Sequence, residues 1–297
     1  MSWLQIKIQT NPENSEPYED LLLSAGCAAV TFEDTEDQPI FEPDLGTTPL
    51  WSKTTITGLF SAEHNLEETL LYIKQGHQQL FPGIPAPTIK AEILEDKDWE
   101  REWMDNYHPM QFGNRLWVCP SWREAPDPDA VNLMLDPGLA FGTGTHPTTA
   151  LCLEWLDGQK LNDNYIIDYG CGSGILGIAG LLLGAEKAIG VDIDPQALQA
   201  TKDNLNRNNL ADDILHVYLP ENTPSDEADV VIANILAGPL VQLAPTLSKL
   251  VKSGGSICLS GLLSPQEQEI REAYSQYFEL DNVSEKDGWI RITGTKR

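Results

Sequence analysis

Two acidic residues and a run of glycines have the spacing of a nucleoside-binding site. Asp168 ends an apolar run, and glycines then follow at every second position, as Gly170, Gly172 and Gly174. Glycine lets a ligand approach the backbone closely, and a helix that begins after such a turn offers unpaired N–H groups. Asp192 lies 22 residues after Gly170, where an acidic residue accepts hydrogen bonds from a ribose diol. The pattern therefore predicts a nucleoside site.

The same residues indicate the charge of that nucleoside. A dinucleotide site needs the order G-x-G-x-x-G, so that a pyrophosphate lies on the helix end, and the glycine run has a different order. The Asp168 carboxylate would repel a phosphate and favour a cation. Asn234 ends a later apolar run, where its amide can touch both cofactor and acceptor; alternatively it satisfies the backbone of a turn. A sulfonium cofactor fits, because it is cationic and carries a ribosyl adenine without phosphate.

The elements around these residues predict a doubly wound, Rossmann-like α/β sheet of seven strands over residues 111–297. From Tyr165 onward, strand patterns occur at 165–168, 188–192, 215–219, 229–234 and 256–259. Helical patterns follow them at 175–183, 196–206, 239–251 and 266–277. The C-terminal part predicts an antiparallel hairpin of residues 278–283 and 289–293 around Asp287-Gly288.

A second glycine-rich turn, at residues 136–149, precedes this repeating part. Strands at 115–120 and 131–135 lead into it. The turn opens a helix that runs to about Leu156, with Thr145 as the expected N-cap and Pro147 in the first turn.

Residues 1–94 predict a smaller α+β domain. Strand patterns at 3–8, 28–33, 54–60 and 88–94 and helical patterns at 18–25 and 66–80 give the order β-α-β-β-α-β. This is the order of a ferredoxin-like split βαβ unit. Residues 95–110 are the expected linker, with a helix over 95–107 in which Trp99 and Trp103 pack.

The charge favours a basic partner. The 297 residues carry a formal charge of −26, and residues 8–52 contain no Lys or Arg. Such a surface repels free nucleic acid and attracts basic proteins. There is no signal-peptide layout and no apolar run of roughly 20 residues, so we expect a cytoplasmic protein without a membrane partner. The five scattered cysteines predict reduced thiols and no metal site.

Three longer runs carry a family resemblance: residues 95–104, 135–149 and 234–240. With the Asp168 glycine run and the Asp192 strand end, they resemble class I S-adenosylmethionine-dependent methyltransferases. The closer resemblance is to the bacterial methyltransferases that modify the eleventh large-subunit ribosomal protein (L11). It covers essentially the whole chain. The runs 95–104 and 135–149 are specific to that family, whereas the glycine run marks only the superfamily.

The resemblance implies methyl transfer from S-adenosyl-L-methionine to lysine side-chain amines and the N-terminal amine of that ribosomal protein. It also implies that the 1–94 domain recognises the substrate, and we expect the protein to act as a monomer. Asn234 is the expected catalytic residue. The expected cofactor-binding residues are Phe141, Gly142, Thr145, Thr149, Asp168, Gly170, Gly172, Asp192 and Asn234. The loop 141–145 is expected to close over the methionine end of the cofactor.

Methyl transfer from a sulfonium needs no covalent nucleophile, so Cys171 is interpreted as a packing residue. The rate should come mainly from alignment of amine, methyl and sulfur. The sequence offers no convincing general base. His146 lies in the expected loop, but a histidine there is more often a helix-start residue, and desolvation of the amine is the alternative way to keep it neutral.

Two other functions remain open at this point. A nicotinamide-dependent oxidoreductase is disfavoured by Asp168 and by the order of the glycines. A non-catalytic adapter, which would bind a basic protein through the acidic N-terminal part, leaves Asn234 and residues 136–149 without a role.

Overall fold

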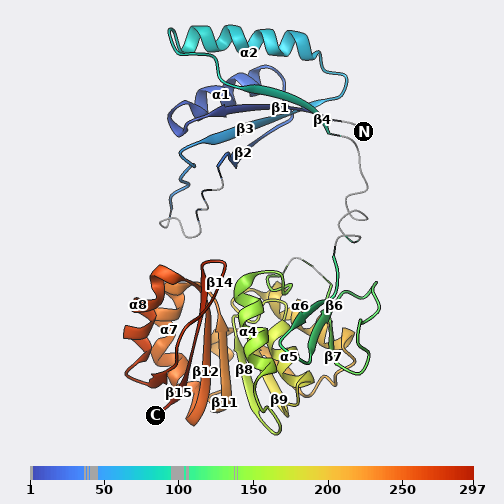
Figure 1. The fold of residues 1–297 in the computed structure, drawn as a ribbon, viewed down its shortest axis with the longest axis vertical. Helices are drawn as coiled ribbons and strands as arrows, with labels where there is room; N and C mark the ends of the chain where they lie inside the picture. Colours follow the sequence, from blue (N-terminus) through green and yellow to red (C-terminus); the bar gives the residue numbers. More distant parts are fainter. Residues whose placement is uncertain are drawn as a thin grey trace. The chain divides into compact units, whose positions relative to one another are not determined.

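The computed structural model describes residues 3–36, 38, 40, 46–94, 104, 107–136, 138 and 140–297. By its internal contacts the chain divides into two compact units, Met1–Met104 and Asp105–Arg297. Figure 1 shows both units. Of the helix predicted over residues 95–107, including Trp99 and Trp103, all but Met104 and Tyr107 lie outside the described residues.

The first unit is a four-stranded antiparallel sheet with two helices on one face (Figure 1). The strands, in the order β2-β3-β1-β4, are β1 (Trp3–Thr10), β2 (Ala29–Asp34), β3 (Thr54–Ser61) and β4 (Ile89–Leu94). The helices are α1 (Pro12–Ser24) and α2 (Leu66–Leu80). Leu4, Ile6 and Ile8 alternate along β1 and are buried in one core with Tyr18 and Leu22 of α1. The predicted sequence of strands and helices is confirmed.

The start predicted for α1, at Tyr18, is wrong. Pro17 lies inside the helix, where proline is usually unfavourable. The helix instead begins at Pro12, because the side chain of Asn11 accepts a hydrogen bond from the Asn14 N–H (3.0 Å) and Pro12 needs no partner in the first turn. The buried side chains of Tyr18 and Leu22 hold the helix on the sheet despite Pro17.

The second unit contains a mixed sheet with helices on both faces (Figure 1). Its path runs β10-β9-β8-β11-β12-β15-β13, and β14 also pairs with β15. The bounds are β8 (Tyr165–Tyr169), β9 (Lys187–Val191), β10 (Leu215–Tyr218), β11 (Ala228–Asn234), β12 (Val251–Leu263), β13 (Phe278–Leu280), β14 (Ser284–Lys286) and β15 (Trp289–Lys296). Five strands of this path are parallel to one another, namely β10, β9, β8, β11 and β12. Strand β15 is antiparallel to β12. The predicted α/β fold is confirmed.

Five helices cover this sheet. They are α4 (Pro147–Asp157), α5 (Ile175–Leu182), α6 (Pro195–Arg207), α7 (Ala237–Leu250) and α8 (Glu267–Tyr274), with short 3₁₀ turns at Pro220–Asn222 and Ser264–Gln266. Successive residues of β8 enter opposite cores: Ile166 packs with α4 and α5, and Ile167 packs with α7 and α8. This alternation is why a continuous apolar run forms a strand buried on both faces.

The sheet differs from the seven strands that we predicted, because it has eight. The stretch predicted as one strand at 278–283 contributes only β13, and β14 follows it. Both pair with β15 along the edge opposite β12. Between them, Asp281 exchanges hydrogen bonds with Thr293 through its backbone N–H (2.8 Å) and its carboxylate (2.7 Å). The predicted turn at Asp287-Gly288 is confirmed, and both residues have positive φ.

The strands before the second glycine-rich turn form a separate three-stranded sheet. It consists of β5 (Met110–Phe112), β6 (Leu116–Cys119) and β7 (Val131–Met134), in that order. The sequence predicted β6 and β7 but missed β5, since three residues are too short to display an alternating pattern.

In the part of the chain that the structure describes, no helix is long and apolar enough to span a membrane, and no group of three or more His, Cys, Asp or Glu is placed to hold a metal ion.

Candidate active site

Three of the predicted site residues lie where the strand order of the large sheet reverses. From β8 the chain adds β9 and β10 on one side, whereas β11 and β12 lie on the other. In open parallel sheets, ligands bind at the carboxyl ends of the strands at such a switch point. Asp168 is in β8, Asp192 follows β9, and Asn234 is the last residue of β11. The fold therefore brings these three strand ends to one edge.

A cavity of about 460 Å³ opens at this edge. Of the predicted residues, Phe141, Gly170, Gly172, Asp192 and Asn234 line it. Most of the remaining described lining is apolar, and it includes no Lys or Arg. The cavity thus offers hydrogen-bonding groups without a positive charge that would hold a phosphate.

The glycine turn needs its glycines for two reasons. Gly170 and Gly172 have φ values of +80° and +53°, which residues with a side chain rarely adopt. A Cβ on Gly172 would also lie 2.6 Å from the carbonyl oxygen of Phe141. The Phe141 backbone therefore approaches the turn as closely as it does only because residue 172 lacks a side chain.

Asp192 supports the turn from the end of β9. Its carboxylate accepts hydrogen bonds from the backbone N–H of Gly172 (2.9 Å) and of Asp194 (3.0 Å). Asp194 caps α6 by accepting from the Gln196 N–H (2.8 Å). Each carboxylate oxygen of Asp192 still has a lone pair for a ligand in the cavity.

Asn234 has one amide atom bound and one free. Its Nδ2 donates to Oγ1 of Thr149 in α4 (3.3 Å), whereas its Oδ1 is buried and has no hydrogen-bond partner. Thr149 is fully buried and does not itself line the cavity. An unpaired buried acceptor is costly, typically by about 1–3 kcal/mol. The site therefore contains an acceptor that a ligand N–H can satisfy.

Asp168 lies beneath the turn and does not line the cavity. Its side chain is 1% exposed; Oδ2 accepts from the Gly177 N–H (2.9 Å), and Oδ1 has no hydrogen-bond partner. Burial raises the pKa of Asp168 to about 7, and the nearby charge of Asp192 adds to this, against the hydrogen bond from Gly177. Any influence of Asp168 on a ligand therefore acts through its charge across the turn rather than by contact.

The loop before α4 carries the remaining predicted residues. Phe141 is 59% exposed and lines the cavity, while its carbonyl oxygen accepts from the Ser173 N–H (2.9 Å). Gly142 faces a different cavity, and the hydroxyl of Thr145 bonds that of Thr143 (2.8 Å). The loop is thus tied to the glycine turn, but only Phe141 of these three predicted residues lines the main cavity.

The N-cap of α4 is His146, and the prediction of Thr145 was wrong. The Nδ1 of His146 accepts from the N–H of Thr148 (3.3 Å) and lies 2.7 Å from its hydroxyl. The imidazole packs against the rings of Phe141 (5.6 Å between centroids) and Trp289 (4.7 Å), and burial lowers its pKa. Its interpretation as a helix-start residue is therefore confirmed.

The whole chain is similar to one protein family. The family model described as "Ribosomal protein L11 methyltransferase (PrmA)" matches residues 2–297. Relatives named ribosomal protein L11 methyltransferase include one from Pseudomonas fluorescens (strain Pf0-1), 58% identical with 100% of both chains covered. Another, from Marinomonas sp. (strain MWYL1), is 60% identical over 100% of this chain and 99% of its own length. The chain belongs to the ribosomal protein L11 methyltransferase family.

A solved structure of a family member shares the fold. The ribosomal protein L11 methylase from Lactobacillus delbrueckii subsp. bulgaricus is 27% identical and has a TM-score of 0.58. The match covers 64% of this chain and 98% of that one. The resemblance stated from the sequence motifs is thereby confirmed at the level of the family.

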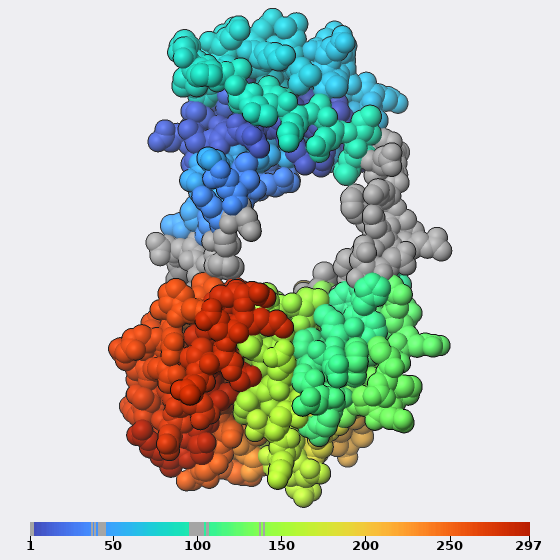
Figure 2. All heavy atoms as spheres, viewed as in Figure 1, coloured from blue at the N-terminus to red at the C-terminus, as the bar shows by residue number. Residues whose placement is uncertain are grey.

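Sequence reasoning missed several cavity residues of this L11 methyltransferase family member. Ile193, which is 83% exposed, directly follows Asp192, and Leu236, 50% exposed, directly follows the Asn234-Ile235 pair. Both lie within two residues of a predicted residue and were within reach of the same argument. Trp289 had no such signal, because it reaches the cavity only through the C-terminal hairpin, whose Arg291 donates to the Leu151 carbonyl of α4 (2.6 Å). Figure 2 shows this hairpin side by side with α4.

Proposed function

We propose that this chain transfers methyl groups from S-adenosyl-L-methionine to lysine side-chain amines and the N-terminal amine of ribosomal protein L11. Family membership over the whole chain supports the activity and the protein substrate. The observation that carries the chemistry is the buried, unpartnered Oδ1 of Asn234 at the end of β11. This atom is an acceptor beside a cavity at the switch point of the sheet, where a donor-bearing amine needs to be held.

The described residues fit S-adenosyl-L-methionine. The positive-φ glycines leave room beside the backbone, Asp192 offers carboxylate lone pairs to a ribose diol, and exposed Ile193 offers an apolar surface to the base. The described lining has no Lys or Arg, which suits a nucleoside without phosphate. When bound, this cofactor supplies a methyl group on a positively charged sulfur.

Asn234 would hold the acceptor amine by accepting a hydrogen bond from its N–H. Thr149 holds the Asn234 amide in one orientation through the 3.3 Å bond to Nδ2, so that Oδ1 remains available. Alignment of this kind can supply roughly 7–11 kcal/mol of a barrier. Asn234 is therefore the residue whose removal should affect turnover most.

The amine must lose its proton before it attacks, and His146 is poorly arranged to take it. Its Nδ1 already accepts from Thr148, so the neutral ring carries its proton on Nε2 and has no acceptor left. The apolar lining, which includes Leu236 and Pro239, instead disfavours a charged amine by desolvation. This lowers the amine pKa and favours the reactive neutral form.

The domain of residues 1–94 is proposed to recognise the substrate, with residues 95–110 as the linker to the catalytic domain 111–297. Its β-α-β-β-α-β order and its β2-β3-β1-β4 sheet support a ferredoxin-like fold. The absence of Lys and Arg from residues 8–52 supports a basic protein as partner. A ribosomal protein substrate agrees with a cytoplasmic location, and the proposal is that the protein acts as a monomer without direct binding to nucleic acid.

The test is methylation of purified L11 by wild type, Asn234→Ala and His146→Ala, followed by mass spectrometry of the L11 amines. We expect Asn234→Ala to lose at least about 100-fold in turnover, by analogy with loss of one hydrogen bond in a preorganised site. His146→Ala should keep most activity at a temperature where its weakened helix cap is tolerated. Comparable turnover by wild type and Asn234→Ala would remove Asn234 from the proposed role.

Calorimetry separates the proposal from its rivals. Binding of S-adenosyl-L-methionine by the wild-type chain is expected, whereas a non-catalytic adapter would give no heat. An oxidoreductase would instead bind NADH and change its absorbance on mixing with a substrate. Either of these results would contradict the methyltransferase proposal.

A further inference from the structure

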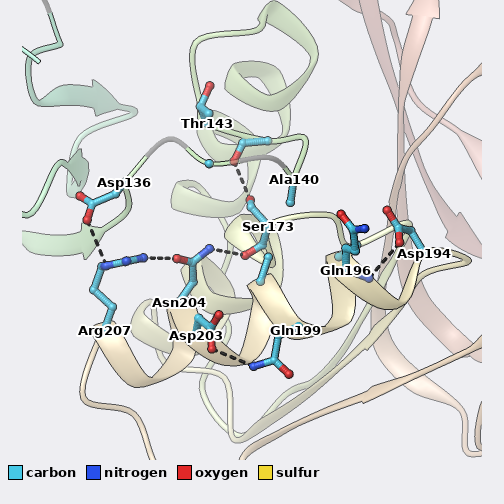
Figure 3. A pocket seen from close by; sticks show the side chains of 14 residues that line it. Asp136, Ala140, Thr143, Ser173, Asp194, Gln196, Gln199, Asp203, Asn204 and Arg207 are labelled. Atoms are coloured by element: carbon cyan, nitrogen blue, oxygen red, sulfur yellow. Dashed lines mark hydrogen bonds and ion pairs between the residues drawn. The ribbon is translucent and has the colours of Figure 1, made fainter. Parts of the chain in front are cut away.

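A second cavity lies on the other side of the loop that carries Phe141. It has a volume of about 380 Å³ and is lined by residues of α6 and by Asp136, Gly138, Ala140, Gly142 and Thr143 (Figure 3). Ala140 and Gly142 line this second cavity, whereas Phe141 lines the first one. The loop therefore separates the two cavities. Contacts that hold the loop from the α6 side also fix the position of Phe141 in the first cavity.

Four polar residues of the second cavity, Asp136, Arg207, Asn204 and Ser173, form one connected chain (Figure 3). Arg207 Nε lies 3.3 Å from Oδ2 of Asp136, and Arg207 Nη1 donates to Oδ1 of Asn204. Asn204 Nδ2 donates to the Ser173 carbonyl (2.8 Å), and the Ser173 hydroxyl donates to the Gly142 carbonyl (2.6 Å). The chain thus runs from Asp136, at the start of the loop, through α6 and the glycine turn, and back to the loop at Gly142.

One end and the middle of this chain have further anchoring contacts or are buried. The carboxylate of Asp136 also accepts from the backbone N–H and the hydroxyl of Ser121 (2.7 and 2.8 Å), just after β6 of the small sheet. Asn204 is 6% exposed, and its amide oxygen and nitrogen both have partners in the chain. A side-chain amide that is buried and hydrogen-bonded through both its oxygen and its nitrogen is a rigid spacer rather than a mobile surface group.

We propose that Arg207 and Asn204 are positioning residues for cofactor binding, because they hold the Phe141 loop where Phe141 lines the cavity at the switch point, here called the cofactor cavity. This inference rests on the proposed function for the identity of the ligand. Neither residue lines the cofactor cavity, so their effect acts through the loop. If the loop adopts the binding-competent conformation in only a fraction of the molecules, the apparent Kd equals the intrinsic Kd divided by that fraction.

The test variant is Arg207→Gln. It removes the positive charge paired with Asp136 and replaces the guanidinium, which contacts both Asp136 and Asn204, with a shorter amide. We expect the Kd for S-adenosylhomocysteine to rise about tenfold, with KM for S-adenosyl-L-methionine raised in parallel and kcat little changed. The matched control is Arg271→Gln. Arg271 is also in an ion pair, with Glu267 at 2.7 Å, but lies on α8, and its loss should leave the affinity unchanged.

Hydrogen exchange gives a second readout that needs no ligand. In the free protein, backbone amides of residues 140–146 should exchange faster in Arg207→Gln than in wild type, and not in Arg271→Gln. Asp136→Asn removes the opposite charge of the same pair and should reproduce both effects, so the inference stays testable if Arg207→Gln does not fold. In the double variant the loss of affinity should be smaller than the sum of the two single losses.

The results separate this inference from the proposed function. Wild type that fails to bind the cofactor would contradict the proposed function, while the exchange experiment would still report on the loop. Wild-type binding together with unchanged affinity and unchanged exchange in both Arg207→Gln and Asp136→Asn would overturn the positioning role. Faster exchange confined to other parts of the chain would also overturn it.

Discussion

Asp168→Asn should make the protein more stable at neutral pH, although it alters the most characteristic acid of the site. Asp168 is 1% exposed, and burial raises its pKa from 3.8 to about 7. Between these two values the folded protein binds more protons at this group than the unfolded chain does. The contribution of Asp168 to stability therefore falls as pH rises through this window and stays at its lowest value above pH 7.

The size of the effect follows from the shift. A shift of about three pKa units corresponds to on the order of 4 kcal/mol, which is an upper estimate for one buried group. Asn at position 168 keeps an oxygen that can accept from the Gly177 N–H (2.9 Å to Oδ2 in wild type), and it carries no charge. We therefore expect Asp168→Asn to lose this pH dependence. Its free energy of unfolding should exceed that of wild type by up to about 4 kcal/mol at pH 8, and by a smaller amount at pH 5.

Urea unfolding of both proteins from pH 4 to pH 8 measures the difference. Asp203→Asn is the matched control, since Asp203 is exposed on α6 and its substitution should leave the pH dependence of wild type unchanged. A stability difference between Asp168→Asn and wild type that does not grow as pH rises from 4 to 7 would refute the assignment of a raised pKa to this carboxyl.

The cofactor should couple to the same proton. A sulfonium near the turn favours the ionised form of Asp168, so binding should release protons. With a pKa of about 7 for Asp168, the release should stay below about one proton per site and fall as pH rises above 7. Calorimetry in buffers of different ionisation enthalpy measures this release. S-adenosylhomocysteine lacks the sulfonium charge and should release less; equal release by both ligands, or release that persists in Asp168→Asn, would contradict the charge argument.

Two further substitutions test the geometry of the site. Gly172→Ala should weaken cofactor binding at least about tenfold, because its Cβ would lie 2.6 Å from the Phe141 carbonyl oxygen; Gly254→Ala has a similar positive φ but open space, so calorimetry should detect no such loss. Thr149→Val should lower kcat by about 10- to 100-fold, because it leaves the Asn234 amide without its 3.3 Å partner. Thr149→Ser keeps the hydroxyl and should retain most activity in the same methylation assay, and equal rates for the Val and Ser variants would show that the hydroxyl is not needed.

The positions of the chemical residues could be predicted because they follow buried parallel strands. Asp168, Asp192 and Asn234 each stand at or just after the end of an apolar run, and parallel strands bring such ends to one edge. Local sequence determined this arrangement almost completely. The same reasoning did not foresee that Asp168 would be covered by the turn, because alternation along β8 places its side chain on the α5 side, where Gly177 binds it.

The features that the sequence did not predict depend on contacts between distant residues. Arg207 meets Asp136 only after α6 has packed beside the loop, and no local pattern pairs these two residues. Trp289 reaches the cavity because Lys286 and Arg291 of the hairpin bind α4, the former through Glu154 at 3.5 Å. The early start of α1 is a competition in which the cap at Asn11 outweighs the unfavourable Pro17.

Two buried acceptors without partners lie on neighbouring strands at the switch point, Oδ1 of Asp168 in β8 and Oδ1 of Asn234 in β11. Each lowers the stability of the free protein, Asp168 through the cost of its buried charge and Asn234 through an unmade hydrogen bond. A ligand that brings a positive charge near the first and an N–H to the second removes both costs on binding. The free-energy cost that these two acceptors impose on the free protein thus adds to the affinity for a cationic cofactor and an amine together. This explains why a substitution that stabilises the empty site, such as Asp168→Asn, should at the same time weaken its preference for the charged form of the cofactor.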